Sequence, residues 1–323
     1  MVLVSVRALA LGTLTAALLV TGALADETAL SDKPIEVVTH SGVGGGTDIT
    51  ARMMMVQAPA ELKTELVVQN KTGGSGAAAL SYANSRPRDG HTILLVTQTH
   101  LLTLLRNKNT GVTFEDLVPL ARATDDPQVL MVGKGSPYKT AKDLLAAAKE
   151  KALKFGATGI GSGDHITTYT FAKAAGIKQP KIVPFRSGGD ITTNLVSGNL
   201  DGSLQNYTEA ESQIKAGDVR PLLVLAEERL PIAPDVPTAK ELGLNVNLST
   251  IRGFVTLKGT PDDRVALLST GLLGAMKGKF YQDYLKGSGA APNSVAGADV
   301  WGKQLTESYE QSRAALQELG LTQ

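Results

Sequence analysis

The sequence predicts an α/β protein of two lobes, each a mainly parallel sheet flanked by helices. Three observations favour this fold class. Segments with the residue patterns of strands and of helices alternate along almost the whole chain. The order strand, glycine loop, acidic helix start occurs at residues 35–48 and again at residues 153–164. The length of 323 residues suits two domains.

Residues 1–25 have the pattern of a secretory signal peptide. Arg7 precedes an apolar run at residues 8–20, and Ala23-Leu24-Ala25 has the small-x-small form of a cleavage site. An uncleaved membrane anchor is the alternative, but the run is shorter than the roughly 20 residues that a span needs. We therefore expect a periplasmic protein whose mature chain begins near Asp26.

The composition excludes several classes of protein. The full chain has 32 basic and 31 acidic residues, and removal of the signal peptide removes Arg7. The mature chain therefore has a formal net charge of zero, and we expect no nucleic-acid partner. The chain has no cysteine, which excludes disulfides, thiolate metal sites and cysteine nucleophiles. Its four histidines form no H-x-x-x-H pair, and we expect neither a metal site nor a cofactor.

The first glycine loop, residues 40–48, follows a predicted strand at residues 35–39 and precedes a predicted helix. Its four glycines let backbone N–H groups approach a ligand, and the helix start adds unpaired donors and a positive dipole end. The loop therefore predicts an anion site, with Thr47 or Asp48 as the helix cap. It fits neither a dinucleotide fingerprint, because Thr47 replaces the third glycine, nor a P-loop, because it lacks the lysine. A loop that only makes a tight turn is the alternative.

The remaining elements of the first lobe follow in order. The predicted elements are a strand at 65–70, a second glycine loop at 71–76, a helix at 77–84, a turn at 86–90 and a strand at 91–97. In parallel sheets covered on both faces, ligands lie beyond the carboxyl ends of the strands.

A seam near residues 124–127 separates the second lobe. After it we expect a strand at 129–132, a helix from the capping box Thr140-Ala-Lys-Asp143 to Lys151, a strand at 153–157, a glycine loop at 158–163 and a helix from Asp164. Further strands are expected at 181–185, 203–206 and 220–226, with a helix from Asp190. Two anion-receptive loops in two lobes suggest a clamp.

We expect lobe 1 to comprise residues 26–125 and 231–323, and lobe 2 residues 126–230. Three prolines at residues 230–238 indicate a connecting segment. A return nearer Ser249 is the alternative, because residues 246–251 can also form a connecting strand. A strand at 253–257 and helices from Asp262 and at 300–319 would complete lobe 1.

The sequence favours binding over catalysis. Ser75, in Gly73-Gly-Ser-Gly-Ala77, is the best nucleophile for a secreted serine hydrolase, but the motif departs from G-x-S-x-G at its last position and no spacing ties a histidine to it.

Arg52 follows Asp48 by four residues, which predicts a helical ion pair. Arg186, beside a glycine pair at a strand end, could instead meet a second ligand charge or face solvent. Trp301 is expected to pack in the core.

The ordered motifs of the chain closely resemble the tripartite tricarboxylate transporter receptors, also called Bug receptors. The likeness covers nearly the whole mature chain, although Ser41-Gly-Val43 and His91 depart from the family's usual residues. The motifs that carry it are Gly44-Gly-Gly-Thr-Asp48 with Ala51-Arg52, Val67-Val-Gln-Asn70 with Gly73-Gly-Ser-Gly76, Arg88-Asp-Gly90, Gly161-Ser-Gly-Asp-His165, Gly198-Asn-Leu-Asp201, and Pro234-Asp-Val-Pro-Thr238 before Glu241-Leu-Gly243.

The resemblance implies a type II periplasmic binding-protein fold whose lobes close on a mono- or dicarboxylate and deliver it to the permease subunits of a tripartite tricarboxylate-type transporter. It implies a monomer without catalytic activity. It further implies that the first loop and the Gly161–His165 loop grip one carboxylate. If the far end of the ligand is a second carboxylate, we expect Arg186 to pair with it; if that end is apolar, we expect Phe185 to matter more. The residues expected to bind the ligand are Val43, Gly45, Gly46, Thr47, Asp48, Asn70, Ser75, Thr97, Gln98, Thr158, Gly161, Ser162, Gly163, His165, Phe185, Arg186, Ser187 and Asn206.

Overall fold

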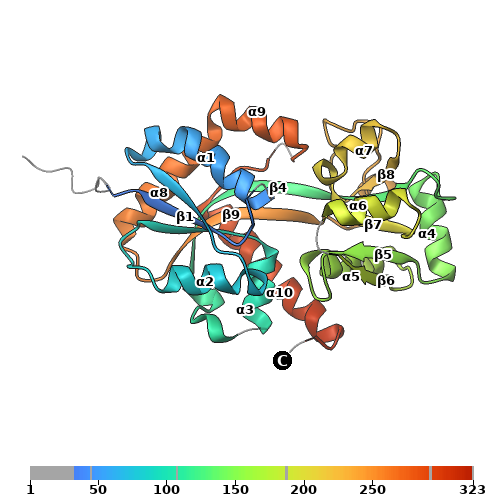
Figure 1. Ribbon diagram of the computed structural model, residues 1–323, viewed down its shortest axis with the longest axis horizontal. Helices are drawn as coiled ribbons and strands as arrows, with labels where there is room; N and C mark the ends of the chain where they lie inside the picture. The colour runs from blue at the N-terminus through green and yellow to red at the C-terminus, as the bar shows by residue number, and fades with distance from the viewer. Residues whose placement is uncertain (1–32, 44–45, 107, 186–187, 291–292, 322–323) are drawn as a thin grey trace, which may run out of the picture.

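The computed structural model describes residues 33–43, 46–106, 108–185, 188–290 and 293–321. The predicted signal peptide, residues 1–25, lies outside this part of the chain. The described residues form two lobes joined by two long strands, β4 and β9 (Figure 1). None of the described helices is long and apolar enough to cross a membrane.

Lobe 1 is a sheet in the order β2-β1-β3-β9-β4, with β10 paired to β4 and with helices on both faces (Figure 1). Its elements are β1 (Ile35–Thr39), α1 (Gly46–Leu62), β2 (Leu66–Asn70), α2 (Ala77–Asn84), β3 (Thr92–Val96), α3 (Gln98–Arg106), β9 (Ser249–Leu257), α8 (Asp262–Lys277), α9 (Lys279–Ser288), β10 (Ala296–Gly297) and α10 (Ala298–Glu318). Short 3₁₀ turns lie at Gly74–Gly76, Lys108–Thr110 and Phe114–Asp116.

Lobe 2 continues the same sheet through β4 into β7, β5 and β6, with β8 on the other side of β4. Its elements are α4 (Ala141–Glu150), β5 (Lys154–Ala157), α5 (Gly163–Ala175), β6 (Lys181–Pro184), α6 (Gly188–Val196), β7 (Gly202–Asn206), the 3₁₀ turn η4 (Tyr207–Glu209), α7 (Glu211–Lys215), β8 (Val219–Val224) and the 3₁₀ turn η5 (Lys240–Leu242). The capping box predicted at Thr140 and Asp143 is confirmed at the start of α4.

β4 (Leu117–Gly133) crosses from lobe 1 to lobe 2 without interruption. Its first part pairs antiparallel with β9 as far as Pro127, and its second part pairs antiparallel with β7 and β8. The predicted seam is therefore a crossing point inside one strand. Parallel pairing is confined to β2-β1-β3 and β6-β5-β7, because β4 and β9 carry the chain in opposite directions between the lobes. The α/β fold class is confirmed, with mixed rather than mainly parallel sheets.

The segment before β9 packs on lobe 2. Val236 and Ala239 are buried in clusters that include residues of β8, and Thr238 forms a bridge with Val224. The Leu248 N–H donates to the Leu225 carbonyl at 3.0 Å. We therefore propose Ser249 as the return point, which is the later of the two positions that the sequence left open.

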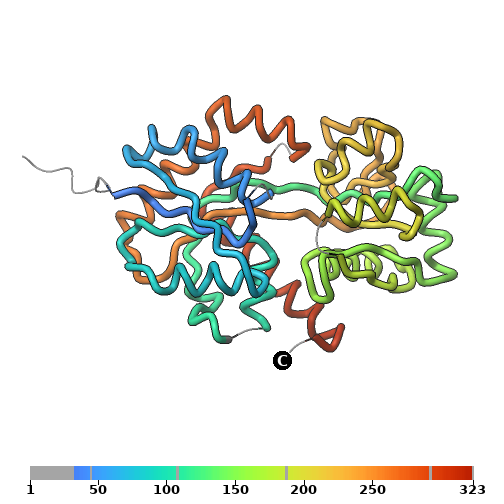
Figure 2. Tube along the Cα trace, viewed as in Figure 1, coloured from blue at the N-terminus to red at the C-terminus, as the bar shows by residue number. Residues whose placement is uncertain are grey.

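Alternation along the strands builds the two cores of lobe 1, because successive side chains point to opposite faces of a sheet. Val37 and Ile93 pack beneath α1 and α8, whereas Val38 and Leu94 pack beneath α2 and α10. The predicted core position of Trp301 is confirmed: its side chain is fully buried. Figure 2 shows the two lobes along the Cα trace, with the green and orange segments of β4 and β9 running between them.

Candidate functional site

Residues of both lobes line the cavities in the cleft. One cavity of about 500 Å³ lies between Gly74 and Ser75 of lobe 1 and residues 158–163 of lobe 2. A second cavity of about 370 Å³ lies between Gly46 and Arg252 of lobe 1 and Thr208 of lobe 2. Both cavities meet the glycine loops that the sequence singled out, which makes this cleft the candidate site.

Side-chain hydrogen bonds brace the first glycine loop. The Asp48 carboxylate accepts hydrogen bonds from Arg52 at 2.9 Å and from the Asn70 amide at 2.8 Å. The Asn70 amide also donates to the Ser41 carbonyl at 2.9 Å. Arg52 thus forms the predicted helical ion pair. Asp48 and Asn70 thus bind each other and the loop backbone, whereas Val43 is exposed and Gly45 lies outside the described residues.

The loop of lobe 2 is held in the same way. Asp164 accepts hydrogen bonds from the Thr158 N–H at 3.0 Å and from its hydroxyl at 2.6 Å. The Ser162 hydroxyl caps α5 by accepting from the His165 N–H, and His165 Nδ1 accepts from the Gly161 N–H at 2.9 Å. Partial burial lowers the pKa of His165 and favours the neutral ring that this bond requires. Gly161 has φ of +74°, a conformation that favours glycine.

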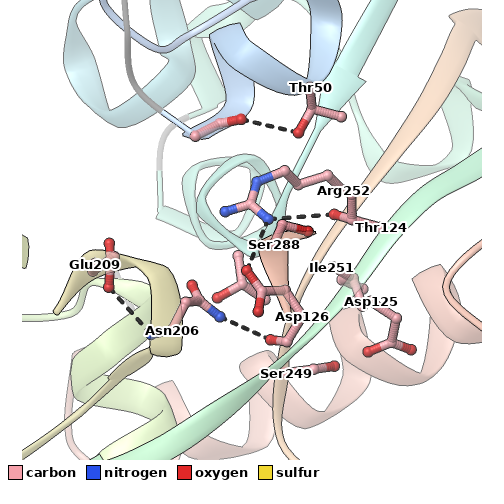
Figure 3. Close-up of polar contacts among 12 residues, drawn as sticks. Thr50, Thr124, Asp125, Asp126, Asn206, Glu209, Ser249, Ile251, Arg252 and Ser288 are labelled. Atoms are coloured by element: carbon pink, nitrogen blue, oxygen red, sulfur yellow. Dashed lines mark hydrogen bonds and ion pairs between the residues drawn. The ribbon is translucent and has the colours of Figure 1, made fainter. Parts of the chain in front are cut away.

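Other predicted side chains also have partners inside the protein. Thr97 accepts from the Thr99 N–H at 3.2 Å, and Gln98 donates to the Ser249 carbonyl at 2.6 Å. Asn206 donates to the Asp126 carbonyl at 2.8 Å, which joins lobe 2 to the crossing strand (Figure 3). Phe185 packs partly against a core cluster. The predicted residues Arg186 and Ser187 lie outside the part of the chain that the structure describes.

Ser75 lies in the left-handed conformation, with φ of +53°, and is exposed at the cavity between the loops. His100, the histidine nearest to this turn by its contact with Gly76, is fully buried and uses Nδ1 to accept from the Thr97 N–H. Among the described residues no hydrogen bond links the Ser75 hydroxyl to a histidine. The hydrolase alternative therefore gains no support from this geometry.

Arg252 is the main residue of the site that the sequence analysis missed. It projects from β9 against the start of α1, where a Cβ on Gly46 would lie 3.0 Å from its Nη2. Its Nη1 lies 3.3 Å from the Thr124 hydroxyl and 3.5 Å from the Asp126 carboxylate (Figure 3). Its Nε is buried without a hydrogen-bond partner. Arg252 therefore brings a guanidinium with an unpaired donor next to the N-terminus of α1.

Two acids lie near this arginine. Burial raises the pKa of Asp126 to about 6, against the lowering effect of Arg252. Glu209 is an exposed residue, but the surrounding protein lowers the hydration of its carboxylate, and this loss, with repulsion from Asp164, raises its pKa to about 7. Burial also lowers the pKa of His40 to about 4, with a contribution from Arg252, so His40 is neutral at pH 7.

A second arginine, Arg106, lines the cavity of about 500 Å³. Arg106, at the end of α3, reaches lobe 2, where its Nη1 lies 3.5 Å from the Gly161 carbonyl. A Cβ on Gly161 would lie 2.6 Å from that nitrogen. Within the described ranges, no acidic side chain forms an ion pair with Arg106. The same ranges contain no group of three acidic or histidine side chains that could hold a metal ion.

Gly161→Ala should weaken ligand binding about tenfold, because the new methyl group meets Arg106 and the backbone angle costs about 1–2 kcal/mol. Gly176→Ala is the matched control, since Gly176 has φ of +62° but no atom within 4 Å of the added carbon. Calorimetric titration of both variants measures the effect. Equal affinity of the two variants would show that the Gly161 loop does not shape the site.

Asp126→Asn should gain stability relative to the wild type as pH rises from about 4 to about 6. The unfolded wild-type chain loses the Asp126 proton near its ordinary pKa of 3.8, whereas the folded chain keeps it until about 6. Rising pH therefore destabilises the wild type in this window, and asparagine does not titrate. The difference in Tm, measured by calorimetry at several pH values, should rise and then level off. A difference in Tm that stays flat over this pH range would contradict this assignment.

The chain is similar to known proteins in sequence and in fold. The sequence model of the family described as tripartite tricarboxylate transporter family receptor matches residues 50–321. A Pseudomonas sp. (strain P51) protein, the UPF0065 protein in the tcbD-tcbE intergenic region, is 31% identical, with 75% of this chain and 73% of the relative covered. The crystal structure of a TctC solute binding protein from Polaromonas is similar, with 26% identity, a TM-score of 0.74 and 88% and 98% of the two chains covered. MatC from Rhodopseudomonas palustris, solved with bound malate, shares the fold at 24% identity, with a TM-score of 0.73 and the same coverage.

Proposed function

The chain belongs to the tripartite tricarboxylate transporter receptor family, and we propose that it binds a small carboxylate between its lobes in the periplasm and delivers it to a membrane permease. Family membership supports the solute-receptor role. The identity of the solute and the delivery step are the parts that we propose for this chain.

The observation that carries the proposal is the position of Arg252. A guanidinium donates strong, charge-assisted hydrogen bonds to a carboxylate, and the start of a helix adds N–H donors and a favourable dipole. Arg252 brings its unpaired Nε to the start of α1 at Gly46, in a cavity that residues of both lobes line. One ligand carboxylate would bind there. The Gly161–Gly163 turn, at the start of α5, would hold the ligand from lobe 2, next to Arg106.

The dimensions of the cleft favour a small acid. The two cavities have volumes of about 370 and 500 Å³. MatC, which has the same fold, was solved with bound malate, a small dicarboxylate. Arg252 and Arg106 each line one of the two cavities and would each be able to meet a charged group of the ligand. The contact expected between Arg186 and a second carboxylate stays a prediction, because Arg186 lies outside the described residues.

Calorimetric titration against a panel of mono- and dicarboxylates, with ester and amide turnover assays alongside, tests the proposal. We expect saturable binding of one acid per chain and no turnover. Turnover that Ser75→Ala abolishes would replace the receptor with a hydrolase. Absence of binding across the panel would also reject the carboxylate assignment.

Ligand should close the two lobes, because β4 and β9 are the two strands that cross between them and the binding groups lie on both sides. Small-angle X-ray scattering should show a smaller radius of gyration in the presence of saturating ligand. An unchanged radius at saturation would contradict the clamp.

A further inference from the structure

We propose that the solute carries an ammonium group beside its carboxylate, with Arg252 holding the carboxylate and with Asp126 and Glu209 holding the ammonium. This inference rests on the proposed function, and it narrows the ligand to amino-substituted carboxylic acids. It derives from the acidic groups that face Arg252, which a receptor for simple dicarboxylates would not need.

The first observation is the unsatisfied carboxylate of Asp126. The residue is only 7% exposed, it lines the same cavity as Arg252, and its Oδ1 has no hydrogen-bond partner. Its Oδ2 lies 3.5 Å from Arg252 Nη1, at the outer limit of a hydrogen bond. A buried carboxylate oxygen without a donor is unfavourable. An ammonium group has three donors and would satisfy it.

The second observation is Glu209, which comes from the opposite lobe. Its Oε2 accepts from the Asn206 N–H at 3.2 Å, and its Oε1 lies against Gly188 at the start of α6. Glu209 is exposed, and Figure 3 shows its side chain across the close-up from Arg252, with Asp126 near the arginine. Closure of the lobes would therefore bring acids from the crossing strand and from lobe 2 to the same part of the ligand.

The charges of the cleft favour such a ligand. Among the described residues, Asp126 and Glu209 lie near Arg252, and Asp164 lies near Glu209, so the described acids outnumber the arginine in this part of the cleft. A dicarboxylate would add two further negative charges, whereas a neutral amino acid adds one charge of each sign. Burial is the main cause of the raised pKa values of Asp126 and Glu209, and a cation beside either carboxylate would offset that effect. A ligand ammonium would supply that cation.

Matched pairs of acids that differ only in an amino group test the inference. The pairs are propionate and alanine, 4-methylpentanoate and leucine, succinate and aspartate, and glutarate and glutamate. We would titrate each into the full protein by calorimetry at pH 8, where Glu209 is ionised. In the pair that fits the cleft best, the amino member should bind at least tenfold more tightly.

Glu209→Gln should reduce that preference at least tenfold by weakening the amino acid, and should leave its unsubstituted partner unchanged or tighter. Asp126→Asn should act in the same direction. Glu211→Gln is the control, because Glu211 pairs with Lys215 on α7 at 2.7 Å and should change neither affinity.

Three results would overturn the inference. Preferential binding of the unsubstituted acids would reject the ammonium subsite, but it would still support the proposed carboxylate receptor. Equal weakening of both members by Glu209→Gln would assign that residue to the structure of the cleft. Failure of the wild type to bind any member of either series would reject both the subsite and the proposed function.

Discussion

Arg252→Met should weaken binding of the cognate acid by more than about 100-fold. A charge-assisted hydrogen bond to a carboxylate contributes about 1.5–3 kcal/mol, and truncating one partner of an enclosed charged pair typically costs about 2–5 kcal/mol. Arg252 offers its unpaired Nε and the nearby Nη2 to a ligand at the start of α1. Methionine keeps much of the side-chain volume and removes the charge. Calorimetric titration at pH 7 measures the loss.

Arg229→Met is the matched control for this experiment. Arg229 pairs with Glu241 at 2.7 Å and lines neither of the two cavities at the glycine loops, so its removal should leave affinity unchanged. Thermal unfolding of both variants separates binding from folding. A folded Arg252→Met protein that binds within about threefold of the wild type would exclude the arginine from the site.

Trp301→Ala should lower the free energy of unfolding by about 3–5 kcal/mol, the usual cost of deleting a buried tryptophan. The ring is fully buried beneath the sheet of lobe 1, and its Nε1 donates to the Phe254 carbonyl at 3.1 Å. It also occupies the space that a side chain at Gly253 would need, since a Cβ there would lie 2.3 Å from the indole. The ring thus holds α10 against β9, the strand that carries Arg252.

Urea unfolding followed by circular dichroism measures this loss, because removing Trp301 also removes the natural fluorescent probe. Val300→Ala is the control, since Val300 is the preceding residue of α10 and is 56% exposed. We expect its effect to stay within about 0.5 kcal/mol. A Trp301→Ala protein as stable as this control would contradict the packing assignment.

Local patterns predicted much of the fold. The strand at 35–39 and the helix at 77–84 have the predicted bounds, because Pro34 and the glycine loop flank the strand and Gly76 and the Arg86-Pro87 turn flank the helix. α9 (Lys279–Ser288) was not predicted, since only Tyr281 and Leu285 of it are buried and its apolar stripe is short. β4 (Leu117–Gly133) is longer than the strand predicted at residues 129–132, for a different reason. Its Asp125, Asp126 and Pro127 resemble a turn in sequence, but pairing with β9 keeps them extended.

The site was harder to predict than the fold. The glycine loops can be recognised from short stretches of sequence. Asp48 and Asn70, which brace the first of them, lie within 30 residues of it along the chain. Arg252 lies more than 200 residues from Gly46, and its contact arises from strand order, which one sequence does not encode locally. A usable signal did exist: Ile251-Arg-Gly-Phe254 places an arginine inside an otherwise apolar strand. A charge at such a position requires a partner or a ligand.

A crystal structure of the protein saturated with its preferred acid tests the central claim most directly. We expect one carboxylate within hydrogen-bond distance of Arg252 and of backbone N–H groups at the start of α1, with the lobes closed so that the Gly161–Gly163 turn also contacts the ligand. A ligand bound elsewhere, for example in the cavity between α3, α5 and α10 that Gln98, Thr167 and Gln311 line, would contradict the account.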